Sequence, residues 1–311
     1  MTPGPARALV VVRTGALTLV EDAGRPGQAH LAVPRSGALD RAALAEANRL
    51  VRNEPGRPGL ETTLTGVALR ATAPCVVAVT GAPAPVTIDG RSVPMSSAVP
   101  LPAGAVLDVG TAQAGLRSYV AVAGGIALGP VLGSCSTDVL SGLGPPPLRA
   151  GDSLPIGVPQ AAPGQVDADP VPVGRRPGGP LVLSITAGPR QDWFTAGALA
   201  TLIGSRYRAS KDSNRIALRL DGPALERAVT VELPSEGLVL GAVQVPADGQ
   251  PLVFLADHPT TGGYPVIAVV DDSDVDACAQ VRPGDEVHFR WSASSDGAAG
   301  GVTGGRYGAR S

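Results

Sequence analysis

The residue types best suited to acid-base or amide chemistry are concentrated between positions 232 and 265. Asp257 and His258 are the only place in the chain where a carboxylate adjoins an imidazole. Neighbouring residues at a strand end point to opposite faces, so we do not expect these two to pair with each other. Histidine transfers protons near neutral pH, and the carboxylate can accept from a substrate amide N–H. Alternatively, Asp257 accepts hydrogen bonds from the backbone amides of Thr260 and Thr261 and only shapes the turn.

Further residues of this segment are candidates for binding a substrate. Gln244 lies between apolar residues, where an unpaired amide costs about 1 to 3 kcal/mol, so it needs partners. These partners are either backbone groups or a planar ligand such as a lactam or a urea, whose donors and acceptors an amide side chain matches in pairs. Tyr264 either walls the same cleft or fills the core, and Glu236 acts as a base or caps its turn. Thr260 and Thr261 are predicted to line the cleft.

A second polar cluster occurs near the N-terminus and contains Asp22, Arg25, Ser36 and Asp40. Arg25, in a Gly-Arg-Pro-Gly turn, can hold a carboxylate through two parallel hydrogen bonds. Alternatively, it pairs with Asp22 or Asp40 and pins the turn to the helix that follows. Arg215, just before a predicted strand, has the same two interpretations. We predict that Arg25, Ser36, Asp40 and Arg215 bind the substrate.

Two motifs that suggest other chemistry do not fit. The acidic run Asp272-Ser-Asp-Val-Asp276 has Ala277 where a calcium loop needs glycine and Pro283 where it needs glutamate, so it is predicted to start a short helix. The serines of Gly133-Ser-Cys-Ser-Thr-Asp138 do not form the Gly-x-Ser-x-Gly turn of a hydrolase. No Cys-x-x-Cys pair is present, so we predict no metal site and expect small buried thiols at Cys75, Cys135 and Cys278.

Composition limits the partners. The 311 residues carry a net charge of -2, and no basic face is available for nucleic acid or for a membrane surface. No segment has the roughly 18 uninterrupted apolar residues of a membrane helix, and the N-terminus lacks the pattern of a signal peptide, so a cytoplasmic protein is expected. Lys211 is the only lysine, and its surroundings fit neither a phosphate-binding loop nor a biotin carrier. If the reaction uses ATP or carboxybiotin, we expect another polypeptide to present it.

The elements that must position these residues read as a mainly β protein in two β-rich halves. Residues 1–157 are predicted to form a β-rich domain with one helix, 158–180 a Pro/Gly-rich linker, 181–291 a second domain, and 292–311 a mobile tail. Apolar residues spaced along one face predict the helix over 38–51, with Ser36 as its N-cap and Asp40 in its first turn.

The second half has one predicted short helix, capped by Thr195, and a sheet that is too large to stay flat. Closure into a barrel removes the exposed edges of such a sheet. The predicted strands lie near 181–186, 216–220, 229–232, 252–256, 266–270 and 286–291.

Four ordered blocks of polar residues, glycine and proline span about residues 9 to 290. They are Glu21-Asp-Ala-Gly-Arg-Pro-Gly27 with Val33-Pro-Arg-Ser-Gly-Ala-Leu-Asp40, Ser118-Tyr-Val-Ala-Val-Ala-Gly-Gly125 with Leu132-Gly-Ser-Cys-Ser-Thr-Asp138, Gly188-Pro-Arg-Gln-Asp192, and Gly241-x-x-Gln244-Val-Pro246 followed by Asp257 and Thr260-Thr-Gly-Gly-Tyr-Pro265. Together they resemble the signature of the allophanate hydrolase subunit 2 family. The chain departs from the family pattern at Cys135, where relatives have arginine, and at Asn214, where aspartate is common.

The resemblance implies cyclophilin-like β-barrels and the role of the C subunit in an ATP-dependent 5-oxoprolinase. That enzyme hydrolyses the lactam of 5-oxo-L-proline to L-glutamate together with an A subunit and a KipI-like B subunit; ATP is used by the complex, and no cofactor is bound by this chain alone. Asp257, His258 and Glu236 would then be the catalytic candidates, and Arg25 would face the substrate carboxylate. Two alternatives remain: a biotin-dependent carboxyltransferase acting on urea or a related amide, and a KipA-like regulatory protein that binds a kinase-inhibitor partner.

Overall fold

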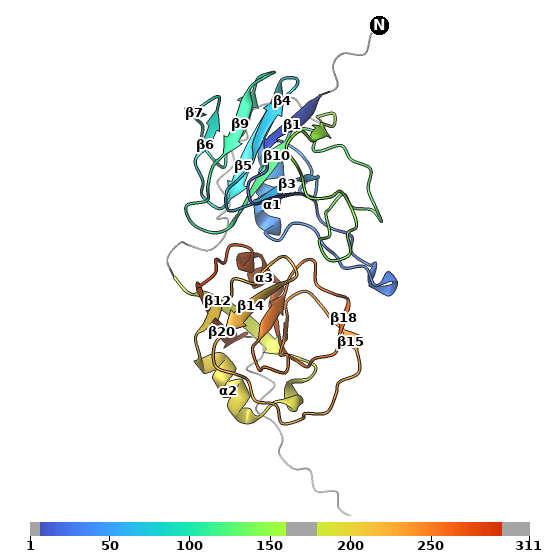
Figure 1. The fold of residues 1–311 in the computed structure, drawn as a ribbon, viewed down its shortest axis with the longest axis vertical. Coiled ribbons are helices and arrows are strands. Elements are labelled where there is room, and N and C mark those ends of the chain that lie inside the picture. The colour runs from blue at the N-terminus through green and yellow to red at the C-terminus, as the bar shows by residue number, and fades with distance from the viewer. Residues whose placement is uncertain (1–6, 160–178, 294–311) are drawn as a thin grey trace, which may run out of the picture.

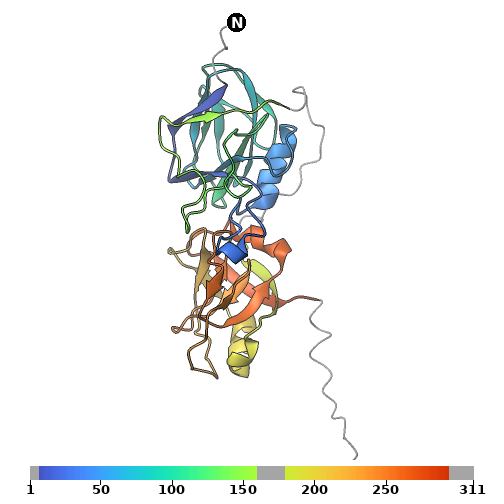
Figure 2. The same ribbon diagram turned by 90° about the vertical axis from the view of Figure 1, so that its right-hand side faces the viewer.

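The computed structural model describes residues 7–159 and 179–293, which form two β-rich domains stacked along the long axis of the molecule (Figures 1 and 2). The predicted mainly β fold with a few short helices is confirmed. The predicted linker 158–180 and tail 292–311 lie largely outside the described residues. Within those residues, no helix has the length and apolar character that crossing a membrane requires.

The N-terminal domain packs two antiparallel sheets against each other. Leu69, Leu107, Val77 and Val120 point between the sheets and belong to one buried core, as alternating strands with one apolar face require. The first sheet has the strand order β11-β1-β4-β9-β6-β7 and the second β2-β3-β10-β5-β8. The strands are β1 Ala8–Arg13, β2 Leu17–Glu21, β3 Gly59–Thr63, β4 Ala68–Ala71, β5 Cys75–Gly81, β6 Val86–Ile88, β7 Arg91–Ser92, β8 Val99–Leu101, β9 Val106–Val109, β10 Arg117–Val122 and β11 Ser153–Pro155.

The predicted first helix is present as α1, Arg41–Leu50, and it packs its apolar face on β5 and β10. Its N-cap is Asp40, whose carboxylate accepts a hydrogen bond from the amide of Ala43 at 2.9 Å. The predicted cap, Ser36, is therefore wrong. Ser36 has a left-handed backbone with φ of 53° and belongs to a loop that runs to the other domain.

The C-terminal domain is a closed barrel of seven strands, which confirms the predicted closure. Leu183, Ile185, Val253 and Phe289 are among the side chains that fill it. The order around the barrel is β12-β19-β16-β17-β14-β13-β20, from β12 Leu181–Ala187, β13 Tyr207–Ala209, β14 Ala217–Asp221, β16 Ala242–Gln244, β17 Leu252–Phe254, β19 Val266–Val270 and β20 Glu286–Trp291.

Two short helices and a two-stranded ribbon lie outside the barrel. Helix α2, Ala196–Gly204, begins after Thr195, whose hydroxyl accepts from the amide of Ala198 as predicted, and the predicted acidic helix is present as α3, Asp272–Cys278. The strand predicted near 229–232 is wrong: residues 229–235 form an irregular loop with Val231 exposed, so no cross-strand burial drives them into a sheet. The small ribbon β15 Glu236–Gly237 and β18 Thr261–Gly262 follows beside this loop.

The two domains are joined by a buried ionic network centred on Arg215. Its guanidinium donates to both carboxylate oxygens of Asp257, at 2.9 and 3.1 Å. It also donates to two groups of the N-terminal domain, the carboxylate of Glu61 at 2.5 Å and the carbonyl of Gly37 at 2.7 Å. Glu21, from the same domain, forms an ion pair with it at 3.2 Å. All the donor nitrogens of the fork therefore face partners, and three of these partners come from the other domain.

A second set of contacts extends this network. Arg117 pairs with Glu61 at 3.3 Å and donates to the carbonyl of Ala279 at 2.6 Å. The side-chain carbonyl of Gln280 accepts from the amide of Arg117, while its NH2 group donates to Asp40 at 2.8 Å. The relative position of the domains thus depends on polar groups that are buried in both of them.

Burial and the arginines shift the pKa values of two carboxyl groups of the network in opposite directions. Burial raises the pKa of Glu21 well above its usual value, and although Arg215 opposes this, the carboxylates of Glu61 and Asp257 add to it. Burial alone would also raise the pKa of Glu61, but the charges of Arg215 and Arg117 lower it below its usual value. Burial therefore disfavours the charged form of Glu21, whereas the two arginines favour the charged form of Glu61.

We predict that Arg215→Met destabilises the protein by about 3 to 5 kcal/mol at pH 7, because it leaves buried carboxylates without a cation. The deficit should shrink as the pH falls and these carboxylates take up protons. Urea unfolding followed by tryptophan fluorescence measures it for the C-terminal domain, which holds both tryptophans, Trp193 and Trp291.

The matched control is Arg41→Ala, which removes the partly exposed ion pairs of Arg41 with Asp272 and Asp276 at the rim of the same interface. Exposed pairs contribute about 0 to 1 kcal/mol, so this change should be mild. Equal effects of the two substitutions would contradict the central place given to Arg215.

Candidate functional site

His258 lies where the chain leaves the barrel, four residues after β17 ends at Phe254, and its ring is 6.0 Å from the ring of Phe254. Its Nδ1 is 2.7 Å from the carbonyl oxygen of Pro259. Because a carbonyl only accepts, Nδ1 must carry the hydrogen, and the lone pair of the neutral ring is then on Nε2. Burial lowers the pKa of His258 below its usual value, although the Pro259 carbonyl and the charges of Asp257 and Asp138 act in the opposite direction. The ring is therefore neutral at pH 7 and Nε2 is able to take up a proton.

Asp257 and His258 have different hydrogen-bond partners and do not pair with each other, as predicted. Asp257 is fully buried, and its carboxylate is shared between Arg215 and the amide of Val139, at 3.2 Å, rather than the amides of Thr260 and Thr261. These contacts place Asp257 in the domain interface. A direct catalytic role for Asp257 stays a prediction, and none of its contacts supports it.

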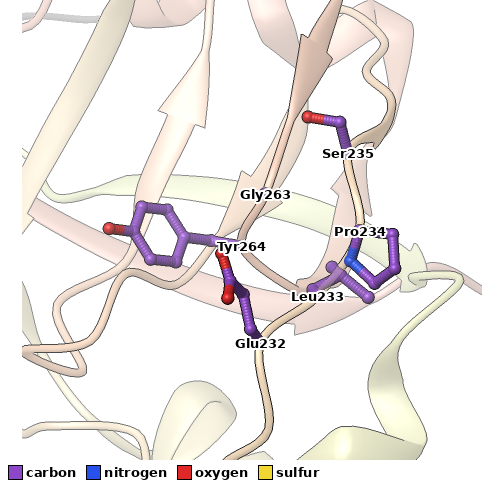
Figure 3. Close-up of a pocket in the computed structure, with 6 residues that line it drawn as sticks. All are labelled: Glu232, Leu233, Pro234, Ser235, Gly263 and Tyr264. Carbon is purple, nitrogen blue, oxygen red and sulfur yellow. The ribbon is translucent and has the colours of Figure 1, made fainter.

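An open cavity of about 550 Å³ lies beside the β15–β18 ribbon (Figure 3). In Figure 3 the ring of Tyr264 extends on one side and Ser235 and Pro234 stand on the other, with the carboxylate of Glu232 directed toward Tyr264. A carboxylate and two hydroxyls at the mouth of a small cavity suit a polar molecule of a few heavy atoms. The lining residues are Glu232, Leu233, Pro234, Ser235, Gly263 and Tyr264.

Gln244, at the end of β16, supports the ribbon rather than lining the cavity. Its NH2 group donates to the backbone carbonyl of Tyr264 at 3.0 Å, so the backbone partner of the two predicted alternatives is the one observed. Gly262 allows this approach, because a Cβ there would stand 2.8 Å from both Gln244 Nε2 and Leu238 Cδ1. Thr261 is exposed and pairs with Gly237 in the ribbon, and Thr260 is half-buried next to it.

Two arginines hold the walls of the cavity. Arg190 makes a two-pronged ion pair with Glu236, with Nε at 2.9 and 3.0 Å from the carboxylate oxygens. This hydrogen bonding lowers the pKa of Glu236 below its usual value, so the carboxylate is ionised and occupied, which makes it a poor base. Arg227 lies over the ring of half-exposed Tyr264 at 5.6 Å and donates to the carbonyl of Val245.

The predicted salt bridge of Arg25 with Asp22 or Asp40 is wrong. Arg25 is buried and donates to the carbonyls of Ser136, at 2.5 Å, and Val131, at 3.4 Å. Asp22 is occupied by the hydroxyls of two serines and by the amide of Cys135 in the same loop. An arginine enclosed in this way has no open side for a substrate carboxylate, and it holds loop 131–144 in place.

Other predicted binding residues also belong to the interface. Ser36 donates through its hydroxyl to the carbonyl of Thr137 and through its amide to that of Ala256 in the other domain. Asp40 caps α1 and contacts Gln280, and burial raises the pKa of its carboxyl to about 6. Arg215, Ser36 and Asp40 are therefore brought together, but around the domain contact and not around the cavity.

The site that these contacts define is a seam between three segments: residues 22–37, 131–144 and 256–264. Asp138 is the main contributor that the sequence pattern did not reveal: its carboxylate accepts from the amides of Leu140 and Ser141, and its charge acts on His258. The dense run of short polar residues at 133–138 was the available signal. Within residues 7–159 and 179–293, no cluster of three His, Cys, Asp or Glu side chains can hold a metal ion, and the three cysteines are free and buried.

The tautomer and pKa of His258 can be measured by NMR titration of the histidine rings. We expect a pKa below 6.5 and the hydrogen on Nδ1. Because the folded-state pKa is lowered, the unfolded chain binds the proton first as the pH falls through about 6.5, so the free energy of unfolding should decrease from that pH downward. His258→Gln should remove this component, whereas a His258 pKa at or above 6.5 would contradict the assignment.

A matched pair of glycines tests the packing of the ribbon. Gly262→Ala should displace the amide of Gln244, break its bond to Tyr264 and cost about 1 kcal/mol. Gly237→Ala, in the paired strand, meets nothing within 4 Å and should change little. Hydrogen exchange of residues 261–264 would accelerate in the first variant only; the same rates in both would show that Gln244 does not hold the ribbon.

Known proteins share both the sequence and the fold of this chain. Residues 31–291 match the family described as "Carboxyltransferase domain, subdomain A and B". The chain is 38% identical over 287 residues to the C subunit of 5-oxoprolinase from Escherichia coli, covering 90% of each chain, and 29% identical to urea amidolyase of Saccharomyces cerevisiae, covering 91% of this chain and 16% of that one.

Solved structures agree. The crystal structure of TTHA0988 superposes with a TM-score of 0.80 at 36% identity, and that of the Kluyveromyces lactis urea carboxylase with a TM-score of 0.84 at 27% identity. Each match covers 93% of this chain, but the chain spans only 56% and 28% of those solved chains. The chain therefore belongs to the carboxyltransferase-domain family that includes the C subunit of 5-oxoprolinase and the corresponding part of the urea amidolyases.

Proposed function

We propose that this chain is the C subunit of an ATP-dependent 5-oxoprolinase, which opens the lactam of 5-oxo-L-proline to L-glutamate with companion A and B subunits. The observation that carries the proposal is the extent of the match: the C subunits of 5-oxoprolinase from Escherichia coli and Haemophilus influenzae are covered over 90% and 86% of their lengths. The urea amidolyases contain the same unit as 16–17% of a longer chain. The higher identity to the C subunits of 5-oxoprolinase, 38% and 32%, than to the urea amidolyases, 29% and 28%, favours the first assignment.

The geometry supports amide chemistry. Hydrolysis of a lactam forms a bond between a water oxygen and the carbonyl carbon, breaks the C–N bond and delivers a proton to the nitrogen. A neutral imidazole with its lone pair on Nε2, as in His258, can take the proton from water and return it to the nitrogen. Tyr264, which follows His258 in the same segment, lines the cavity together with Ser235, and the cavity has room for a five-membered ring.

The ATP chemistry belongs to the companions in this proposal. The chain has one lysine, Lys211, in Ala-Ser-Lys-Asp-Ser, and no phosphate-binding loop around it. Asp257 and Arg215 act by fixing the segment that carries His258. Glu236, held by Arg190, stabilises one wall of the cavity.

A second candidate function is the transfer of a carboxyl group from a biotin carrier to the nitrogen of a urea-like amide. It is favoured by the family match itself and by the TM-score of 0.84 to a urea carboxylase. In this reaction the bond between the biotin nitrogen and the carboxyl carbon breaks as the bond from that carbon to the amide nitrogen forms, and His258 can accept the proton that the amide nitrogen loses and pass it to the biotin nitrogen. The two functions thus share the base and differ in the fate of the amide bond.

The assay that tests the first function is glutamate formation from 5-oxoproline by this chain co-purified with the products of its neighbouring genes. We expect release that depends on ATP, and His258→Ala should lower kcat by about 10² to 10⁴ through loss of proton transfer. His288→Ala, on β20 beside Glu286, is the control and should keep the activity.

Avidin separates the two functions, because it blocks a biotin carrier and leaves a direct hydrolysis untouched. An avidin-sensitive carboxylation of urea, with no glutamate formed, would replace the first function by the second. Full activity of His258→Ala would remove this residue from the mechanism in either case.

A further inference from the structure

Five large aliphatic side chains are exposed on two loops of the N-terminal domain that border the seam. They form what we call the apolar loop surface: Leu31, Val131, Leu132, Val139 and Leu140, with 39–53% of each residue exposed. Single exposed aliphatic residues are ordinary, but a group on two short loops marks an interaction site. In Figures 1 and 2, both loops hang from the N-terminal domain on the side of the molecule that carries the β15–β18 ribbon.

The exposure of Leu132 is not explained by a contribution to the stability of the fold. It occupies the first central position of a two-residue hairpin turn, closed by hydrogen bonds between Val131 and Ser134 at 2.8 and 3.2 Å. Its φ is 51° and that of Gly133 is 86°, a turn that favours asparagine or glycine first. A leucine there costs roughly 1 to 2 kcal/mol of backbone strain, and in this chain it remains 41% exposed. Strain without burial indicates a role in contacts outside the chain.

The loop that presents these side chains is rigid. Asp22 accepts from the hydroxyl of Ser134 and the amide of Cys135, both at 2.6 Å, and Arg25 holds the carbonyl of Ser136. Asp138 accepts from the amide of Leu140 at 2.9 Å. A surface that is already ordered loses little entropy when a partner binds.

The chemistry of the surface selects the partner. Among residues 131–140, Asp138 is the single charged side chain, and it is buried and engaged in its own turn. The loop that carries Leu31 adds the exposed Arg35, so nucleic acid and charged peptides find little counter-charge, whereas an apolar protein face finds aliphatic side chains to pack against. The match to TTHA0988, which leaves a little under half of that chain uncovered, shows that a relative carries a further polypeptide segment joined to this unit.

We propose that the apolar loop surface is the docking site of a companion subunit, which covers the seam and completes the site beside His258. This inference rests on the proposed function. Val139 connects the surface to the site directly, because its amide donates to the Asp257 that precedes His258. The companion must offer a low-charge, concave aliphatic or aromatic face that receives Leu132 and Leu140.

The test is pull-down and titration of tagged variants against the products of the neighbouring genes. Leu132→Asn should raise the Tm of this chain by about 2 °C, since asparagine tolerates the turn, and still weaken the complex by at least about tenfold. Leu140→Asp should weaken it similarly. Val182→Asp is the control: Val182 is equally exposed, at 40%, on β12 at the opposite side of the barrel in Figure 1, and the complex should be unchanged.

The possible failures differ from one another. If the native chain forms no complex with any neighbouring product, the proposed function and this inference both fall. If a complex forms and both surface variants bind as tightly as the Val182→Asp control, the inference falls and the proposed function stands. If light scattering shows that the native chain alone is a dimer which the surface variants dissolve, the surface joins two copies of this chain and the inference is overturned.

Discussion

The guanidinium of Arg215 is the interaction on which the other contacts between the domains depend. It is buried between two domains, and it binds carboxylates from both of them together with a backbone carbonyl. Removing a charge from water costs several kcal/mol, which partners at hydrogen-bond distance must offset. Because only one arrangement of the domains supplies all the partners, the network determines the relative orientation of the two domains more than it adds to the net free energy of folding. Burial raises the pKa of Glu21, which reduces the excess of negative charge in this cluster.

The position of His258 follows from this network. The preceding residue, Asp257, is held by Arg215 and by the amide of Val139, so the backbone that carries the imidazole is anchored from both domains. The carbonyl of Pro259 then sets the tautomer of the ring. Beyond it, the ribbon packs on Gln244 and presents Tyr264 to an open cavity. Within eight residues, one short segment therefore carries a structural anchor, Asp257, the proposed proton-transfer group, His258, and a wall of the cavity, Tyr264.

The relatives show that this pair of domains is used as a unit within chains of different length. It makes up most of the C subunit of 5-oxoprolinase and a small fraction of a urea amidolyase. A unit with an ordered apolar face at its seam can serve in both settings, since a companion can be a separate subunit or a segment of the same chain. The shared part would then be the seam and its base, and the companion would decide which activated group reaches it.

Local sequence patterns were sufficient to specify the main elements. Apolar runs specified most strands of a sheet too large to stay flat, and the spacing of Ala43, Ala47 and Leu50 specified α1. These features depend on residues close to each other in the chain, so their pattern is visible in a single sequence.

Which polar residues face a ligand and which face each other was settled by the packing of the two domains. Arg215 and Glu61 are 154 positions apart, and the partners of Asp257 lie 42 and 118 positions away, so no local pattern predicts that they are buried together. Arg25 likewise contacts carbonyls of a loop more than 100 residues away instead of the nearby carboxylates that local spacing favoured. Burial of a charge is a property of the whole fold, because it is set by what every other segment places around that charge.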